Sequence, residues 1–246
     1  MWSSVGTVPA EYKFSRNEHQ SVIKARTDDE KDHILETLCE KKSLLLQTCT
    51  PTGSIRCETL LLKHPASEDE LKLFHSAAYI DVLKSLESFD LNLDEHVEYG
   101  LGYDCPVLDN LHQLAECVAG GTLSAAKLLV SRKCKTAINW FGGWHHARRD
   151  SASGFCYIND IAIGIQFMST TFERILYIDL DVHHGMDIFN AFENSNKILT
   201  LSFHKHEVGF FSNSGNLDEA GIGKGKNYSL NVPYQGGISD ETPKKM

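Results

Sequence analysis

Apolar residues recur at helical intervals in two segments of the first half of the chain. The first segment contains Leu71, Phe74, Ala78 and Val82. Spacings of three and four residues place such side chains on one face of a helix. Ser67 and Glu70 have the capping-box spacing that begins a helix. The pattern therefore predicts amphipathic helices over 67–86 and 111–133. The helix predicted over 111–133 contains small residues suited to close packing, at Ala119, Gly120 and Gly121.

The pattern changes to short apolar runs in the second half. The runs of strand length are 134–140, 174–182, 197–203 and 227–232. Segments of helix length, 159–168 and 185–194, lie between them. Alternation of this kind, with nearly continuous apolar strands, is typical of a parallel sheet covered on both faces by helices. We therefore predict a single α/β domain with three layers, and we predict no elements for 1–66, where periodicity is weak.

Composition and charge exclude several classes of protein. The chain has 246 residues, a formal net charge of −9 and a pI near 5.7. A nucleic-acid surface normally carries a basic excess, so no direct nucleic-acid partner is expected. Neither a signal peptide nor a membrane-spanning run is found, which favours a soluble intracellular protein. The seven cysteines form no C-x-x-C pair and are expected to be buried thiols rather than a disulfide framework.

Polar residues follow the first three strands of this half. The stretch IDLDVHHG, 178–185, ends the second of them. If the strand continues through it, Asp179, Asp181 and His183 share one face. The D-x-H spacing lets Asp181 and His183 offer an oxygen and a nitrogen to one divalent cation. Ligand sites of open parallel sheets lie at the carboxyl ends of strands, so we favour a metal site over a simple strand cap.

A second pair of histidines follows the strand 134–140. His145 and His146 come after two glycines, and a histidine beside a metal-activated water is the usual general base. Two further polar stretches are less specific. GIGKGKN, 221–227, lacks the spacing of a phosphate-binding loop and is interpreted as a turn. HKHEVGFF, 204–211, is either a metal-binding tract or a loop whose Phe210 and Phe211 line a pocket or pack on the core.

Four longer stretches together resemble one known family. They are EYGLGYDCP, INWFGGWHHARRDSASGFCYIND, RILYIDLDVHHG and GKGKNYSLNVP. They resemble class I histone deacetylases, in order and without a large gap from about Leu71 to about Thr242. The resemblance implies an arginase-like α/β domain around eight parallel strands and zinc-dependent hydrolysis of the acetyl amide on lysine. It makes 67–246 a deacetylase domain, incomplete at its C-terminus relative to the family, and leaves 1–66 poorly matched.

The resemblance also implies roles for single residues. His145 and His146 correspond to the tandem catalytic histidines, and Asp179 to the carboxylate that orients His145. Asp181 and His183 correspond to two zinc ligands, whereas the third, a later aspartate, is not identifiable in this chain. The residues implied to bind substrate are Asp104 at the rim and Gly154, Phe155 and Phe211 as walls of the acetyl-lysine tunnel. Potassium sites would map to Asp179, Asp181, His183, Ser202 and Phe203, and to Phe192, Ser195, Ile198 and Tyr228.

Two positions depart from the family pattern. Met186 stands where the family has the aspartate that supports the second histidine, unless Asp187 takes that place. Phe141 replaces a small residue before the glycine pair. The tyrosine that donates to the oxyanion is also not identifiable. These departures keep a non-catalytic interaction protein or splice product open as the alternative.

The sequence leaves open which substrate the protein acts on and whether the chain is incomplete. The expected partners are acetylated lysines of histones or other proteins and corepressor-type proteins, in the nucleus or cytoplasm and without a membrane. Acetylated polyamines or a guanidinium group are other substrates for the same chemistry. An incomplete chain would expose a sheet edge and apolar faces.

Overall fold

The structure of the chain is a computed structural model that describes residues 46–49, 58–60, 64–86 and 96–237. All of these residues belong to one unit, Lys42–Met246. Two strands, β1 (Leu46–Cys49) and β2 (Glu58–Leu60), lie in the part of the chain where periodicity predicted no elements. They are too short to reveal an alternating pattern in the sequence.

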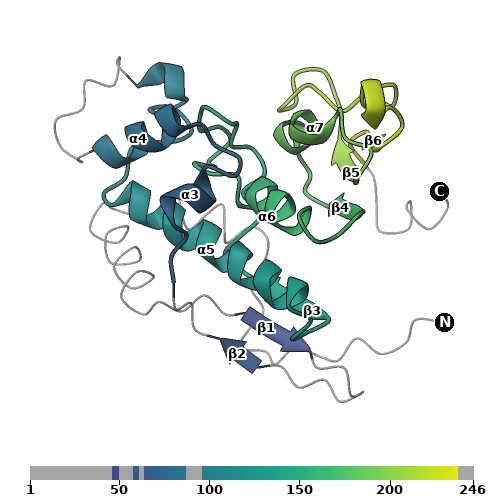
Figure 1. The fold of residues 1–246 in the computed structure, drawn as a ribbon. Coiled ribbons are helices and arrows are strands. Elements are labelled where there is room, and N and C mark those ends of the chain that lie inside the picture. Colours follow the sequence, from purple (N-terminus) through teal and green to yellow (C-terminus); the bar gives the residue numbers. More distant parts are fainter. Residues whose placement is uncertain (1–45, 50–57, 61–63, 87–95, 238–246) are drawn as a thin grey trace. The chain divides into compact units, whose positions relative to one another are not determined.

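The described strands form two sheets of three strands each (Figure 1). β1 pairs antiparallel with β2 and with β3 (Thr136–Asn139). β4 (Ile175–Asp179), β5 (Ile198–Lys205) and β6 (Ser229–Tyr234) pair in parallel. The predicted α/β class with a parallel sheet is confirmed by the second sheet. β3, in contrast, pairs with β1 and not with β4.

The segment 67–86 is two helices rather than the single helix predicted. α3 covers Glu68–Leu71 and α4 covers Ala77–Ser85. The capping box is confirmed, because the Ser67 hydroxyl accepts from Glu70 N and the Glu70 carboxylate accepts from Ser67 N. The second helix begins separately because the side chain of Ser76 accepts from Tyr79 N as an N-cap. Periodicity alone does not reveal such a break.

Three further helices pack against one another and against the strands. α5 (Leu111–Val130) contacts β3 and α6 (Asp160–Met168), and α6 also contacts α7 (Met186–Phe192). Close packing at the glycines of α5 is confirmed, since a Cβ on Gly120 would lie 2.8 Å from Ala66 N. The core between α6, α7 and β5 consists of Ala162, Ile165, Ile188, Phe192 and Ile198. None of the described helices is long and apolar enough to cross a membrane.

One face of the parallel sheet is exposed in the described part of the chain. Leu176, Ile178 and Leu180 alternate along β4 and just beyond it, with exposed fractions of 55%, 50% and 60%. The prediction that helices cover both faces is therefore wrong for these residues. The reason is that continuous apolar runs report how a strand could be buried, whereas only the packing of other segments decides whether it is.

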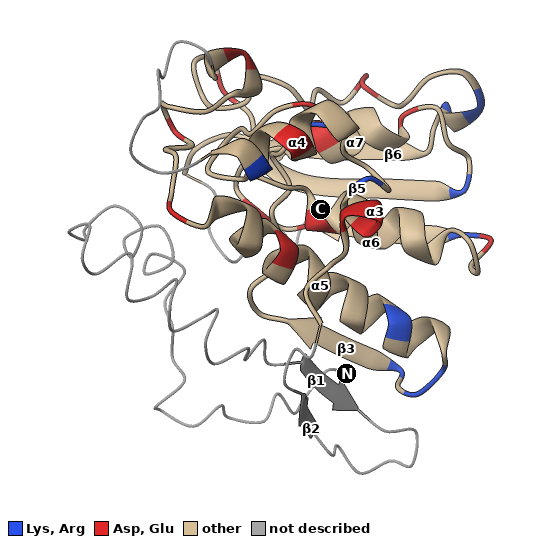
Figure 2. Ribbon diagram, turned by 60° about the vertical axis from the view of Figure 1, so that its left-hand side comes forward, with Lys and Arg blue, Asp and Glu red and all other residues tan. Residues whose placement is uncertain are grey.

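Charged side chains are distributed without a basic stripe. Figure 2 shows short, separate positions of lysine and arginine along the described ribbon, with aspartate and glutamate on several helices. Glu68 is one centre of exposed pairing, with Lys72 at 2.5 Å and with Lys84. Such exposed pairs contribute little to stability, because water screens their charges.

Candidate functional site

The loop that follows β3 places His145 against Asp179, the last residue of β4. His145 Nδ1 donates to Asp179 Oδ2 at 2.7 Å, and both side chains are buried. The Tyr177 hydroxyl donates to the same oxygen at 2.7 Å, and Asp181 N–H donates to Oδ1 at 2.9 Å. Three donors thus hold the carboxylate of Asp179, which in turn fixes the ring of His145.

The charges of this pair support each other. Burial by itself would lower the pKa of His145, but the hydrogen bond and charge of Asp179 outweigh it and raise the pKa. Burial would raise the pKa of Asp179, but His145, Asp181 N–H and the Tyr177 hydroxyl together lower it. The pair therefore favours an imidazolium beside a carboxylate.

His146 lies beside this pair but has a different electrostatic environment. Its ring centroid is 3.9 Å from that of His145 and 5.0 Å from that of Phe211. Burial, aided by the charges of His145 and His183, lowers the pKa of His146 to about 3. At neutral pH one histidine of the tandem therefore holds a proton more firmly than usual while the other remains neutral.

Asp187 does not take the place of the carboxylate that Met186 replaces. Its Oδ1 lies 3.3 Å from Arg148 Nε, and within the part of the chain that the structure describes it makes no hydrogen bond to His146. Burial raises the pKa of Asp187 to about 6, although Arg148 opposes this. The one-residue shift considered from the sequence is therefore not observed. The reason is that Asp187, in the first turn of α7, lies within reach of Arg148 instead.

Asp181 and His183 lie beyond the end of β4, which stops at Asp179. The predicted continuation of the strand through Val182 is wrong, because the chain bends where Asp181 accepts from His183 N at 2.8 Å. Even so, the two side chains converge, with Asp181 Oδ1 3.1 Å from His183 Nδ1. Two ligands of a tetrahedral zinc ion with arms near 2.0–2.1 Å lie about 3.3 Å apart. The separation therefore fits a shared cation.

These two residues are an incomplete ligand set by themselves. Among the residues that the structure describes, no group of three or more histidine, cysteine, aspartate or glutamate side chains could hold a metal ion. The donor types and their spacing fit zinc, and the third ligand that a catalytic zinc site requires lies outside this set.

Aromatic side chains surround the histidines on the exposed side. Phe211 makes edge contacts with His146 and with His183, at centroid distances of 5.0 and 5.9 Å, and the Phe210 ring stacks on His183 at 5.2 Å. Of the two readings of HKHEVGFF, the structure supports aromatic side chains that line the site. His204 is instead buried, donating from Nε2 to Gly215 O and accepting at Nδ1 from Ser202 Oγ.

The loop 151–156 also lies against the histidines, since Gly154 is next to His146. Asp104 Oδ2 accepts from Gly154 N at 2.7 Å, which joins two of the four residues that the resemblance assigned to substrate. Phe155 is exposed by 41%. The structure thus brings Gly154 next to His146 and Phe211 next to both His146 and His183.

Replacing Gly154 with alanine (G154A) should disturb this contact. Gly154 has φ +54°, and a Cβ there would lie 2.6 Å from Cδ2 of His146. Strain and overlap together should cost about 1–3 kcal/mol and displace the His146 ring. Thermal unfolding would measure the loss, with G143A as control: Gly143 also has a positive φ of +100°, but a Cβ there has open space. A G154A protein as stable as the wild type would contradict the expected overlap.

The residues proposed as potassium ligands fall into two places. Asp179 and Ser202 are opposite each other in the β4–β5 register, with Asp181 and His183 just beyond and Phe203 next along β5. Phe192 and Ile198 share one core cluster, while Phe192 O accepts from Ser195 N and Tyr228 O accepts from Thr200 N. The second set therefore consists partly of carbonyl groups that already accept hydrogen bonds.

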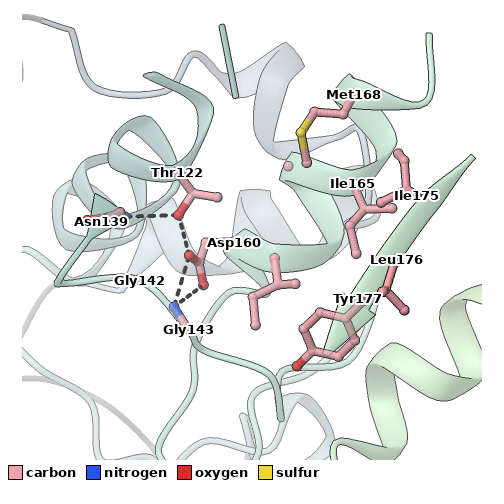
Figure 3. A pocket seen from close by; sticks show the side chains of 12 residues that line it. Thr122, Asn139, Gly142, Gly143, Asp160, Ile165, Met168, Ile175, Leu176 and Tyr177 are labelled. Atoms are coloured by element: carbon pink, nitrogen blue, oxygen red, sulfur yellow. Dashed lines mark hydrogen bonds between the residues drawn. The ribbon is translucent and has the colours of Figure 1, made fainter. Parts of the chain in front are cut away.

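Sequence reasoning missed the residues that hold the start of the histidine loop by hydrogen bonds. Asp160, buried at the start of α6, accepts from Trp144 N at 2.8 Å, from Gly143 N at 3.1 Å and from the Thr122 hydroxyl (Figure 3). Asn139 Nδ2 donates to the same hydroxyl at 2.9 Å. These residues help to line a pocket of about 230 Å³ between β3, α6 and β4, and neither the histidines nor the aromatic wall is part of its lining. The one signal in the sequence that could have indicated Asp160 is its position as an aspartate at the start of a predicted helix.

Acid should weaken the fold partly through His75. Burial lowers the pKa of His75 to about 4, below its usual 6.5, so the unfolded chain binds the proton first. The free energy of unfolding should therefore fall as pH decreases from about 6.5 to about 4, by up to about 3 kcal/mol from this group. Urea unfolding at pH 7 and pH 4.5 would measure this, and H75Q should flatten the dependence. An unchanged slope in H75Q would contradict the assignment.

Comparison with known proteins agrees with this geometry. The sequence model of the Histone deacetylase domain matches residues 26–246. Histone deacetylase 8 of Xenopus tropicalis is 41% identical over 211 residues, which are 85% of this chain and 57% of that protein. Histone deacetylase 8 of Xenopus laevis is 47% identical over 177 residues, 72% of this chain and 54% of that protein. Histone deacetylase RPD3 of Saccharomyces cerevisiae is 43% identical over 180 residues, 72% of this chain and 41% of that protein.

The chain thus spans about half the length of these relatives. The matches include the stretches that carry both histidine pairs, Asp179 and Phe211, which the structure brings together. The chain therefore belongs to the histone deacetylase family, and it is similar to the histone deacetylase 8 type of class I.

Proposed function

We propose that this chain carries the histidine side of a zinc-dependent lysine deacetylase site, which hydrolyses the acetyl amide of N-acetyl-lysine in histones or other proteins. The observation that carries the proposal is the buried pair of His145 and Asp179 beside a neutral His146, within ring contact of Phe211. Asp181 and His183 would hold the zinc ion. When bound, zinc would act as a Lewis acid toward the acetyl carbonyl and make water a better nucleophile.

The chain's own residues suggest how protons move. A neutral His146 can accept a proton from a water molecule while the oxygen of that water attacks the acetyl carbon. The Nδ1 proton of His145 is held in the hydrogen bond to Asp179. A second proton, on Nε2, can therefore be donated to the developing oxyanion or to the leaving amine. The C–N bond then breaks, the amine nitrogen takes a proton, and acetate and the free lysine side chain are released.

The aromatic wall supports acetyl-lysine over a charged substrate. Phe155 and Phe211 offer apolar surface that suits the methylene stem and the neutral acetamide. A charged lysine or guanidinium would lose hydration against these aromatic rings. Residence in the nucleus or cytoplasm and a role in transcription with corepressor-type partners belong to the same proposal.

The test is release of acetate from acetyl-lysine peptides by the purified, zinc-loaded chain. We expect turnover that a chelator abolishes and that the double variant H145A/H146A lacks. A panel with acetylated polyamine and arginine would separate the substrate classes. Stoichiometric zinc without chelator-sensitive acetate release would sink the catalytic proposal.

A non-catalytic deacetylase-like protein is the second candidate. Its support is Met186, together with the pairing of Asp187 with Arg148 instead of His146. The variant M186D distinguishes the two candidates. If His146 lacks a needed carboxylate, M186D should raise a low acetate-release rate, whereas high turnover by the unmodified chain would exclude this candidate.

A further inference from the structure

Asn159 ties the backbone of the tandem histidines to the beginning of α6. Its side-chain Nδ2 donates to His145 O at 3.3 Å and to Ala147 O at 3.0 Å. Its Oδ1 accepts from Ala162 N at 2.9 Å as the N-cap of α6. The side chain is fully buried. Because these carbonyls lie one residue before and one residue after His146, Asn159 fixes the peptide groups around the tandem pair.

His75 holds Asn159 from the other side. His75 Nε2 accepts from Asn159 N at 2.9 Å, and His75 Nδ1 lies 3.1 Å from Arg149 O. A backbone N–H can only donate and a carbonyl can only accept, so Nδ1 must carry the proton. The ring is 1% exposed, and burial lowers its pKa to about 4, which keeps it neutral. Both nitrogens of His75 are therefore used to join the histidine loop to Asn159.

The neighbours of His75 contact the same loop at two further places. Ser76 N also donates to Arg149 O, at 3.1 Å. The Tyr79 hydroxyl donates to Tyr157 O at 2.6 Å, and the Tyr79 ring packs 5.4 Å from that of His75. Residues 75–79, at the start of α4, thus contact the loop at residues 149 and 157. His75 belongs to this set of contacts.

We propose that His75 and Asn159 are positioning residues that set the direction of the His145 ring toward Asp179. This proposal rests on the proposed function. It adds that the proposed reaction also depends on His75 and Asn159, although neither residue touches the reacting groups. The contact it controls is the 2.7 Å hydrogen bond from His145 Nδ1 to Asp179 Oδ2. A displacement of a catalytic group by about 1 Å can cost about 10²-fold in rate, so a loosened loop should lower turnover without touching substrate.

Two variants of His75 separate positioning from packing. In H75Q the side-chain oxygen can replace Nε2 as acceptor for Asn159 N, whereas in H75N the shorter amide can replace only Nδ1 as donor to Arg149 O. Both changes remove the ring, so both should destabilise the fold to a similar degree. Only H75N should release Asn159.

The first readout does not need activity. In the chain labelled with 15N-histidine, the proton on His145 Nδ1 should give a far-downfield signal, assigned by its absence in H145A. We expect this signal to persist in H75Q and to be lost or broadened in H75N. The same spectrum should show wild-type His75 protonated at Nδ1 only. An unchanged His145 signal in H75N, or His75 protonated at Nε2, would overturn the proposal.

The second readout is acetate release by the full chain. We expect kcat to fall by about 10-fold to 10²-fold in H75N, with KM nearly unchanged, and by less than about threefold in H75Q. Equal losses in both variants that follow their thermal stability would mean a merely structural role and overturn the proposal. If the wild-type chain shows no turnover, the proposed function fails, while the spectra still decide the positioning.

Discussion

Replacing Asp179 with asparagine (D179N) should lower kcat for acetyl-lysine hydrolysis by about 10³-fold to 10⁴-fold, as expected when a histidine loses the carboxylate that fixes its tautomer. Oδ2 of Asp179 accepts from both His145 Nδ1 and the Tyr177 hydroxyl. An amide offers one acceptor oxygen and one donor group. If its NH₂ faced His145, it would force the proton from Nδ1 to Nε2.

The measurement is kcat for an acetyl-lysine peptide, beside circular dichroism to establish that D179N is folded. D150N, which alters an exposed carboxylate on the same loop as His145, is the matched control and should stay within about threefold of wild type. A folded D179N enzyme with nearly normal kcat would show that His145 does not depend on this carboxylate. The orientation argument would then be wrong.

Replacing His183 with alanine (H183A) should weaken zinc binding by more than about 10²-fold, since changing even an outer partner of a ligand costs about 10-fold to 10²-fold. Asp181 Oδ1 and His183 Nδ1 lie 3.1 Å apart, as two ligands of one cation would. Removing the imidazole leaves a carboxylate that is itself exposed. A lone exposed carboxylate competes poorly with water for zinc.

Isothermal titration with Zn²⁺ at pH 7 would give both affinities directly. H206A is the control, because His206 lies on the neighbouring strand exit and its Nδ1 contacts Ser214 O. Unchanged zinc affinity in H183A would place the metal elsewhere. Equal losses in H183A and H206A would indicate a general effect on the loop rather than loss of a ligand.

Local sequence patterns anticipated the helices and strands of the second half of the chain. The capping box at Ser67 and the polar exits of 134–140, 174–182 and 197–203 all depend on neighbours in the sequence. The break between α3 and α4 was missed because Ser76 acts through its own hydrogen bond, which periodicity does not contain. The strand that was expected to run through Val182 ends at Asp179 for a similar reason.

The sequence predicted candidate site residues, but it did not predict the contacts that hold them in place. His145, His146 and Asp179 were identified through the resemblance, yet the pairing of Asp187 with Arg148 was not. The residues that hold the loop, His75 and Asn159, are separated by 84 positions. No local pattern relates them.

By itself, the sequence determined the class of fold and the order of most elements, because these follow from periodicity and capping, and its family resemblance indicated candidate site residues. Only the tertiary structure decided that β3 pairs with β1, that one face of β4 is exposed and that His145 and His146 have opposite pKa shifts. The physical reason is that pairing, burial and electrostatic environment are set by segments distant in the chain. A residue's type fixes what it can donate or accept, and its neighbours in space decide what it does.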